Sequence, residues 1–287
     1  MIQRSPTLVN FFTIQNRYLR KCRGDPGIYF AYSPGTMDKT SNPTPAEPNA
    51  IESKVQLEEV RIPLAEPIHG HSELSGVLGI PEWWPTGERV AVVIAHGGPS
   101  NFDDPLIASL TRKLTTRDFL TLRFNFPFAE AGKRSSADSP EALKRGFRAA
   151  LNTLGRDPTA LPARLFVGGV GLGGRVAAGL VADRLHADGL FLLGFPLHPQ
   201  DKPEKSDLDV LFRATAPMLF IQGTRDRRCN GTALRNCLRR VGAPIEMYDI
   251  EEADSSFHVP KKSGRTEEET HAEVFGVLST WLNRRLR

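Results

Sequence analysis

The clearest potential for chemistry lies in a glycine-rich stretch, Leu165–Leu180, with the sequence LFVGGVGLGGRVAAGL. An apolar run leads into the glycines and small residues follow them, which is typical of a turn between a strand and a helix. Such turns usually hold a reacting side chain or a phosphate group. This one contains no Ser, Cys or Asp, so the chemistry depends on which kind of turn it forms.

A dinucleotide-binding loop is one interpretation, because Gly169, Gly171 and Gly174 satisfy the spacing G-x-G-x-x-G. That motif also requires an acidic residue at the end of the next strand, where it binds the ribose. The next apolar run ends instead in FPLH, residues 195–198. The glycines would also follow the third parallel strand rather than the first. Dinucleotide binding is therefore the remote alternative.

A nucleophile elbow, G-x-S-x-G, is the favoured interpretation of the same turn. Gly171 takes the serine position and has a glycine two residues before it and another two residues after it. An earlier apolar run ends in AHGGPSN, where hydrolases place a loop that donates one backbone N–H to an oxyanion. The expected oxyanion donors are the N–H groups of Gly98 in that loop and of Leu172 in the elbow.

An acid follows the elbow in the chain order of hydrolases, which is nucleophile, acid, histidine. The motif IQGTRD places Asp226 just after an apolar run, 55 residues beyond Gly171. An Asp at the end of a strand is often only a turn residue, but this context assigns Asp226 to the acid position.

The chain from Arg89 to Leu282 resembles the small dienelactone-hydrolase-like α/β-hydrolases. That family includes bacterial proteins of uncertain substrate and the hydrolase-like domain of a subunit of the animal nonspecific-lethal chromatin complex. The resemblance rests on AHGG, LRFNFPFAEAGKR, GFPLHPQDKPEK, FIQGTRD and ADSSFHVPKKSGRT. The family's elbow has the form G-G-x-S-x-G and its last motif the form A-D-H-S-F. The match implies that the nucleophile position is Gly171, the acid position Asp226 and the base position Ser255.

Two of the three catalytic positions are therefore substituted. Glycine supplies no nucleophile, and a serine hydroxyl does not accept a proton near neutral pH. Loss of either group costs a hydrolase about a millionfold in turnover. We therefore expect a degenerate hydrolase that binds a ligand or a partner. The alternative is an esterase or dienelactone-hydrolase-like enzyme in which His258 activates a water in the space left by Gly171, so enzymatic activity stays open.

Other residues with chemical potential have narrower expectations. His96 and His198 are expected to face the pocket, as substrate contacts or as packing residues. His69 and His71 have the spacing of metal ligands but no acidic or cysteine partner nearby, so they predict a hairpin turn. Cys229 does not lie on an elbow and is not expected to be a nucleophile. We expect no metal and no cofactor.

The elements that must position these residues follow from the apolar pattern. Residues 55–81 contain two alternating stretches typical of an antiparallel hairpin, and denser apolar runs then alternate with helical stretches. Dense runs indicate strands that are covered on both faces. The pattern predicts an α/β-hydrolase fold, with a mostly parallel, doubly wound sheet and an N-terminal antiparallel hairpin. The six dense runs are residues 89–98, 119–127, 163–169, 189–196, 217–223 and 244–250.

Residues 1–54 are predicted to be a basic tail and linker that is disordered or processed, and residues 55–287 to be the hydrolase domain. Residues 34–54 are rich in Pro, Ser, Thr and Asn and lack an apolar period. The first 24 residues carry five basic side chains and no acidic one, which suits either a disordered tail or a transit peptide. A start at Met37 would remove this segment.

Composition limits the expected partners and location. Beyond residue 24 the chain has 32 basic and 33 acidic residues, so the pI near 9.0 comes from the N-terminal segment, and no nucleic-acid partner is expected. Three cysteines without paired spacing favour a reducing compartment. No apolar stretch has the roughly 18 residues that span a bilayer, so no membrane association is expected. We expect a small-molecule ligand or ester in the pocket, or a protein partner, and a cytoplasmic location, or a mitochondrial one if the N-terminus is a transit peptide.

Overall fold

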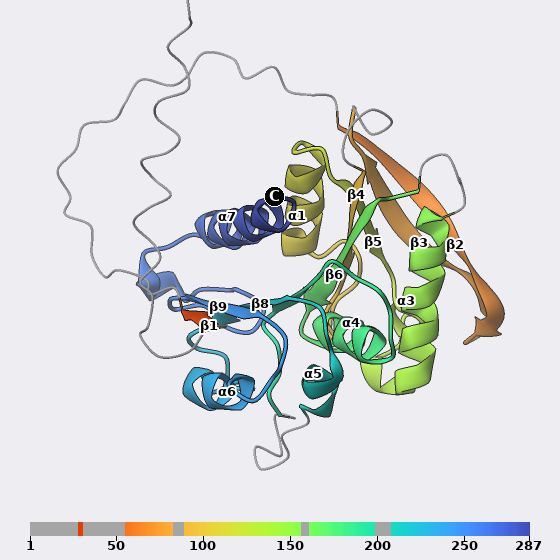
Figure 1. Cartoon of the computed structure of the whole chain (residues 1–287). Coiled ribbons are helices and arrows are strands. Elements are labelled where there is room, and N and C mark those ends of the chain that lie inside the picture. The colour runs from red at the N-terminus through yellow and green to blue at the C-terminus, as the bar shows by residue number, and fades with distance from the viewer. Residues whose placement is uncertain (1–27, 31–54, 83–88, 156–160, 199–207) are drawn as a thin grey trace, which may run out of the picture.

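A central sheet dominates the computed structural model, which describes residues 28–30, 55–82, 89–155, 161–198 and 208–287. Its strands have the order β1-β9-β8-β7-β6-β4-β5-β3-β2 (Figure 1). All eight predicted strands are present, and the predicted α/β-hydrolase fold is confirmed. The strands are β1 (Ile28–Phe30), β2 (Gln56–Ile68), β3 (His71–Ile80), β4 (Val90–Ala95), β5 (Leu120–Phe124), β6 (Arg164–Val170), β7 (Gly189–Leu193), β8 (Met218–Gly223) and β9 (Ile245–Ile250).

Seven α-helices and two short 3₁₀ turns connect these strands within the described residues. The helices are α1 (Pro105–Thr115), α2 (Pro127–Glu130), α3 (Pro140–Leu154), α4 (Leu172–Ala182), α5 (Asp209–Arg213), α6 (Gly231–Leu238) and α7 (Glu267–Arg285), and the 3₁₀ turns are η1 (Ser135–Ala137) and η3 (Lys261–Ser263). The predicted helix starting at Pro140 is confirmed, since the hydroxyl of Ser139 accepts a hydrogen bond from the backbone N–H of Ala142.

The sheet combines a parallel centre with an antiparallel edge. β2 and β3 pair antiparallel around a turn at His69 and Gly70, and β3 pairs antiparallel with β5. The remaining pairs, from β5 through β4, β6, β7, β8 and β9, are parallel. Because the carboxyl ends of parallel strands meet at one edge of a sheet, the segments that follow β4, β6, β7, β8 and β9 converge there.

Helices cover both faces of the sheet, which explains why every residue of β4, β5, β7 and β8 is buried. On one face, apolar side chains of α1 and α7 pack with alternate strand residues around Trp281. On the other face, α3, α4, α5 and α6 pack around residues such as Phe147 and Phe220 (Figure 1). These two cores fix the strand ends from which the site is built.

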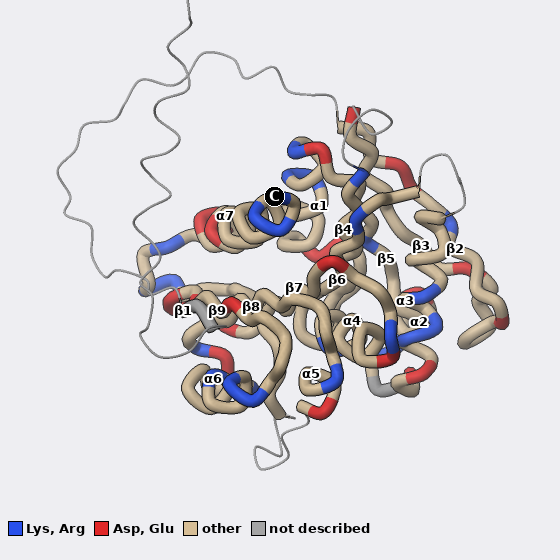
Figure 2. Tube along the Cα trace, in the orientation of Figure 1, with Lys and Arg blue, Asp and Glu red and all other residues tan. Residues whose placement is uncertain are grey.

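The N-terminal segment is described only at β1, which pairs in parallel with β9 at the edge of the sheet. The rest of the predicted tail and linker, including Cys22 and the segment for which a transit peptide is the alternative, lies outside the described residues, so the prediction for residues 1–54 stays a prediction. Basic and acidic residues are interspersed over the described helices and loops (Figure 2). None of the helices in this part of the chain is both long enough and apolar enough to cross a lipid bilayer.

Candidate active site

The turn between β6 and α4 has the backbone geometry of a nucleophile elbow. Gly171 lies between the two elements with φ 51° and ψ −105°, a backbone conformation that residues with a side chain rarely adopt. The space beside it is open: a Cβ on Gly171 would lie 3.7 Å from Nη2 of Arg228 and 3.9 Å from the carbonyl oxygen of Gly194. The elbow therefore keeps its shape and the room for a side chain, while the nucleophile itself is absent.

The loop after β4 approaches the elbow where the oxyanion donors were predicted. A Cβ on Gly98 would lie 3.8 Å from Cδ2 of Leu172 and 3.1 Å from Oγ of Ser135. The N–H groups of Gly98 and Leu172 donate to no acceptor among the residues that the structure describes. Leu172 is also the first residue of α4, so its N–H points out of the helix N-terminus. Gly98 and Leu172 therefore lie next to each other in space, and their role as oxyanion donors stays a prediction.

His96 does not line the pocket as predicted, because its ring is buried in the protein and has an exposed fraction of 0%. The backbone N–H of Phe126 donates to Nε2 at 3.0 Å, so the neutral ring carries its proton on Nδ1 and donates it to the carbonyl oxygen of Gly97 at 2.8 Å. Burial lowers the pKa of His96 to about 4. The residue therefore positions the start of the loop rather than contacting a ligand.

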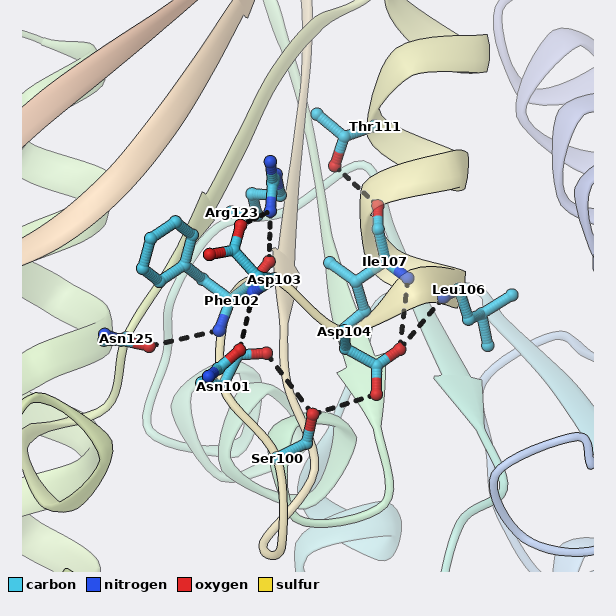
Figure 3. Close-up of polar contacts among 10 residues, drawn as sticks. All are labelled: Ser100, Asn101, Phe102, Asp103, Asp104, Leu106, Ile107, Thr111, Arg123 and Asn125. Carbon is cyan, nitrogen blue, oxygen red and sulfur yellow. Dashed lines mark hydrogen bonds and ion pairs between the residues drawn. The ribbon is translucent and has the colours of Figure 1, made fainter. Parts of the chain in front are cut away.

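Polar contacts fix the rest of this loop between β4 and α1 (Figure 3). The guanidinium of Arg123 donates to the carbonyl oxygen of Phe102 and to the carboxylate of Asp103, and Oδ1 of Asn125 accepts from the Phe102 N–H at 3.1 Å. Asp104 caps α1 by accepting from the first helical N–H groups. The loop that carries Gly98 is thus held at both ends before any ligand arrives.

Asp226 lies after β8, as predicted for the acid, and only 8% of it is exposed. Its Oδ1 accepts the backbone N–H of Arg228 at 2.8 Å, and its Oδ2 accepts from Gln222 at 3.4 Å. Burial raises the pKa of Asp226 and the Asp254 carboxylate adds to this, whereas the Arg228 backbone N–H and guanidinium act in the opposite direction. In a catalytic triad this carboxylate would orient a histidine. In this structure Asp226 instead accepts hydrogen bonds from Arg228 in its own loop and from Gln222 in β8.

Ser255 lies in the turn after β9 and meets the end of β7. A Cβ on Gly194, which has φ 56°, would lie 2.0 Å from the carbonyl oxygen of Ser255, so only glycine permits this approach. The same turn contacts the acid loop, because the N–H of Arg225 donates to the carbonyl oxygen of Ala253 at 2.8 Å. The structure therefore brings Ser255 to the edge of the sheet that also holds Gly171 and Asp226.

Arg228 is the residue that sequence reasoning missed. Its Nη2 donates to Oγ of Ser255 at 3.2 Å and lies 3.7 Å from where a Cβ on Gly171 would be. The guanidinium thus fills the space between the nucleophile position and the base position. The sequence held one signal, the run RDRR at residues 225–228 directly after a predicted strand, at the sheet edge where ligands bind.

A cavity of about 480 Å³ opens beside these groups. It is lined by residues 225–228 after β8 and by six residues between Glu252 and Pro260 after β9, among them Ser255 and His258. Gly171, Gly98 and Leu172 are not part of this lining, and Arg228 lies between the elbow and the cavity. The cavity therefore belongs to the acid and base loops.

His258 faces one acidic residue of the cavity lining, Asp254, and one outside it, Glu267. Its Nδ1 lies 3.7 Å from Asp254 and its Nε2 3.9 Å from Glu267, and 60% of its side chain is exposed. It therefore lines the same cavity as Asp226 and Ser255, while its ring nitrogens lie near other carboxylates. His198 is not in the lining, and its backbone N–H donates to the carbonyl oxygen of Arg228 at 3.3 Å.

The remaining chemically active residues lie outside this site. His69 forms the hairpin turn with Gly70, as predicted, and its Nε2 lies 2.5 Å from Oδ1 of Asp138. Burial raises the pKa of Cys229 to about 12, so its thiol is neutral at physiological pH. Within the described ranges, no group of three or more His, Cys, Asp or Glu side chains could hold a metal ion.

Comparison with known proteins agrees with this fold. The model of the alpha/beta hydrolase domain family matches residues 88–283. The structure is similar to that of a dienelactone hydrolase from Anabaena variabilis, at a TM-score of 0.61 and 20% identity, over 80% of this chain and 98% of that chain. It is also similar to an esterase from Pyrococcus furiosus, at a TM-score of 0.64 and 15% identity, over 86% of this chain and 98% of that chain.

A third similar structure is an alpha-beta serine hydrolase homologue from Coxiella burnetii, with a TM-score of 0.59 and 16% identity, over 77% of this chain and 95% of that chain. At these identities the solved structures show the fold and no more. The match to the family model spans the elbow, the acid loop and the base loop.

Proposed function

The chain belongs to the α/β-hydrolase domain family, and on that premise we propose that it is a degenerate member which binds a ligand in place of hydrolysing one. In this proposal Gly171 occupies the nucleophile position, Asp226 the acid position and Ser255 the base position. Acyl transfer needs a nucleophile and a base that takes its proton. The glycine at position 171 cannot act as the nucleophile, and the serine at position 255 cannot act as the base.

The observation that carries the proposal is the placement of Arg228. Its guanidinium lies beside Gly171 and donates to the Ser255 hydroxyl, in the space where a hydrolase would need a neutral proton acceptor. An arginine stays protonated in proteins and accepts no proton. Three residues, Gly171, Ser255 and Arg228, thus oppose hydrolysis by a catalytic triad, rather than the first two alone.

A small molecule is the ligand that the cavity favours. Its volume of about 480 Å³ lies within the range of roughly 300–1,000 Å³ that is usual for small-molecule sites. The N–H groups of Gly98 and Leu172 provide a second polar feature, which lies outside the cavity lining.

The competing function is ester hydrolysis through His258 and a water molecule. One observation favours it: His258 lines the same cavity as Asp226 and Ser255. Against it, the His258 ring is exposed and lies near the carboxylates of Asp254 and Glu267, and Asp226 already accepts bonds from Arg228 and Gln222.

Hydrolysis assays separate the two functions. The full chain would be incubated with p-nitrophenyl acetate and butyrate and, separately, with a fluorophosphonate probe that labels activated serines. We expect no labelling and no turnover above that of the His258→Ala variant. Ester turnover that the His258→Ala substitution abolishes would show that the protein is an enzyme and that the proposal is wrong.

A further inference from the structure

We infer that Arg228 has converted the lost catalytic centre into a binding site for a small carboxylate with an apolar tail. The inference rests on the proposed function, because it assigns to Arg228 the space that a catalytic imidazole would need. It adds the chemical class of the ligand and the residue that selects it. The carboxylate would lie against the cavity side of the guanidinium, beside Ser255.

The guanidinium of Arg228 is available for an anion. It has five N–H donors, of which one donates to Ser255. Within the ranges that the structure describes, no carboxylate forms an ion pair with it. Asp226 accepts the backbone N–H of Arg228 at 2.8 Å, and the guanidinium charge acts on the Asp226 carboxylate from beyond ion-pair distance. A planar guanidinium binds a carboxylate through two parallel hydrogen bonds, which makes a carboxylate its best-matched small partner.

Ser255 supplies a further donor at the same place. Its oxygen accepts the hydrogen bond from Arg228, so the hydroxyl proton is left to donate elsewhere. A hydroxyl in that position suits a carboxylate oxygen already held by the guanidinium. The serine that removes the catalytic base thus adds a hydrogen bond to the ligand.

The charges around the cavity favour a single negative charge over two. The rim carboxylate of Glu252 pairs with Arg225 at 3.6 Å, and Asp254 accepts the backbone N–H groups of Ser256 and His258. Asp226 also lines the cavity, and its carboxylate interacts electrostatically with the guanidinium of Arg228. Arg227 also lines the cavity, so the lining holds three arginines and three carboxylates. Because Arg225 is already paired with Glu252, and Asp226 and Asp254 would repel a second negative charge, phosphate should bind less well than a monocarboxylate.

Two apolar residues of the cavity lining support an apolar tail on the proposed ligand. Val259 and Pro260 are half-buried and line the cavity beyond Ser255. A ligand whose carboxylate reaches Arg228 can lay an alkyl or aryl group along this wall and remove apolar surface from water. Butyrate and benzoate should therefore bind more tightly than acetate.

Calorimetric titration of the full chain tests the inference. Butyrate and benzoate would be compared with their uncharged amides, butyramide and benzamide, and with inorganic phosphate. We expect the carboxylates to bind at least tenfold more tightly than the amides, and Arg228→Gln to weaken carboxylate binding by about tenfold to a hundredfold. Arg239→Gln removes the same charge from an exposed position at the C-cap of α6 and serves as the matched control.

The results separate this inference from the proposed function. Equal binding of carboxylates and amides by the unmodified protein would overturn the inference even if Arg228→Gln did not fold, and so would phosphate binding as tight as butyrate binding. Carboxylate binding together with ester turnover would overturn the proposed function but leave Arg228 as the site of the acid product. Absence of both turnover and carboxylate binding would overturn the inference and leave the loss of catalysis standing.

Discussion

Nη2 of Arg228 donates a hydrogen bond to Oγ of Ser255 at 3.2 Å, and this contact joins the loop after β8 to the loop after β9. In a working triad the same two loops would be joined by a carboxylate and an imidazole. Here a permanent cation and a neutral hydroxyl take that place. The acid loop therefore carries both a retained feature, Asp226, and a feature opposed to catalysis, Arg228.

Restoring the triad should require three substitutions rather than two. The Gly171→Ser, Ser255→His double variant would place its new imidazole against the guanidinium of Arg228, which disfavours the imidazolium that must form when the serine loses its proton. We expect the double variant to label with fluorophosphonate at least about tenfold more slowly than the triple variant that adds Arg228→Ala.

The matched control for this comparison is Arg228→Ala alone, which should show no labelling because it has no nucleophile. Circular dichroism of all variants would establish that each is folded. If the double variant labels as fast as the triple variant, the guanidinium does not oppose catalysis and our account of Arg228 is wrong.

The two glycines with positive φ at the site should differ in their tolerance of alanine. At Gly171 the added Cβ meets nothing closer than 3.7 Å, so only backbone strain of about 1–3 kcal/mol is expected. At Gly194 the Cβ would also lie 2.0 Å from the Ser255 carbonyl oxygen, so the base loop must move. Gly194→Ala should therefore lower the free energy of unfolding more than Gly171→Ala, which urea denaturation would measure. Equal losses would show that the close approach does not constrain the loop.

The sequence predicted the features that depend on local pattern. The dense apolar runs located the parallel strands, and the glycine spacing located the elbow at Gly171, because strand burial and turn geometry are encoded by nearby residues. Family motifs then placed Asp226 and Ser255 at the same edge of the sheet. These are positions of backbone segments, which strand order brings together.

Side-chain direction was less predictable from sequence, because contacts between distant segments set it. His96 was predicted to face the pocket, but the N–H of Phe126, thirty residues away, holds its ring in the core. Arg228 escaped notice for the same reason, since its direction depends on bonds between the acid loop and the β9 end, such as Thr224 N–H to the Ile250 carbonyl oxygen. Both contacts join segments that are far apart in the sequence, so the spacing of neighbouring residues does not predict them.

Cys229 should be inert to thiol reagents in the folded protein. Burial raises the pKa of its thiol to about 12, whereas Cys237 is only partly buried. Because the thiolate is the reactive form, iodoacetamide at pH 8 should modify Cys237 and leave Cys229 unmodified until urea unfolds the chain. Peptide mass spectrometry would identify the modified residue. Rapid modification of Cys229 in the folded protein would show that the thiol is accessible and ionised, and would reopen its assignment as a non-nucleophile.

His96 should make the protein less stable as the pH falls below neutrality. Its pKa is lowered by burial from 6.5 to about 4, so between these values the unfolded chain binds a proton that the folded protein does not. The stabilisation by the neutral ring is complete above pH 6.5 and is lost progressively toward pH 4. Between pH 7.5 and pH 5 this group alone should lower the free energy of unfolding by about 2 kcal/mol.

The His96→Gln variant isolates this effect, because a glutamine can still bond to neighbouring backbone but does not titrate. We expect it to be less stable than the unmodified protein at pH 7.5, by about 1–3 kcal/mol for the altered buried hydrogen bonds, and to lose less stability on acidification. The exposed His186→Gln variant should retain the full pH dependence. Protonation of His96 would also break its bond from the Phe126 N–H, and urea denaturation curves at several pH values would measure the resulting loss of stability. Parallel pH profiles for the unmodified protein and His96→Gln would rule out His96 as the titrating group.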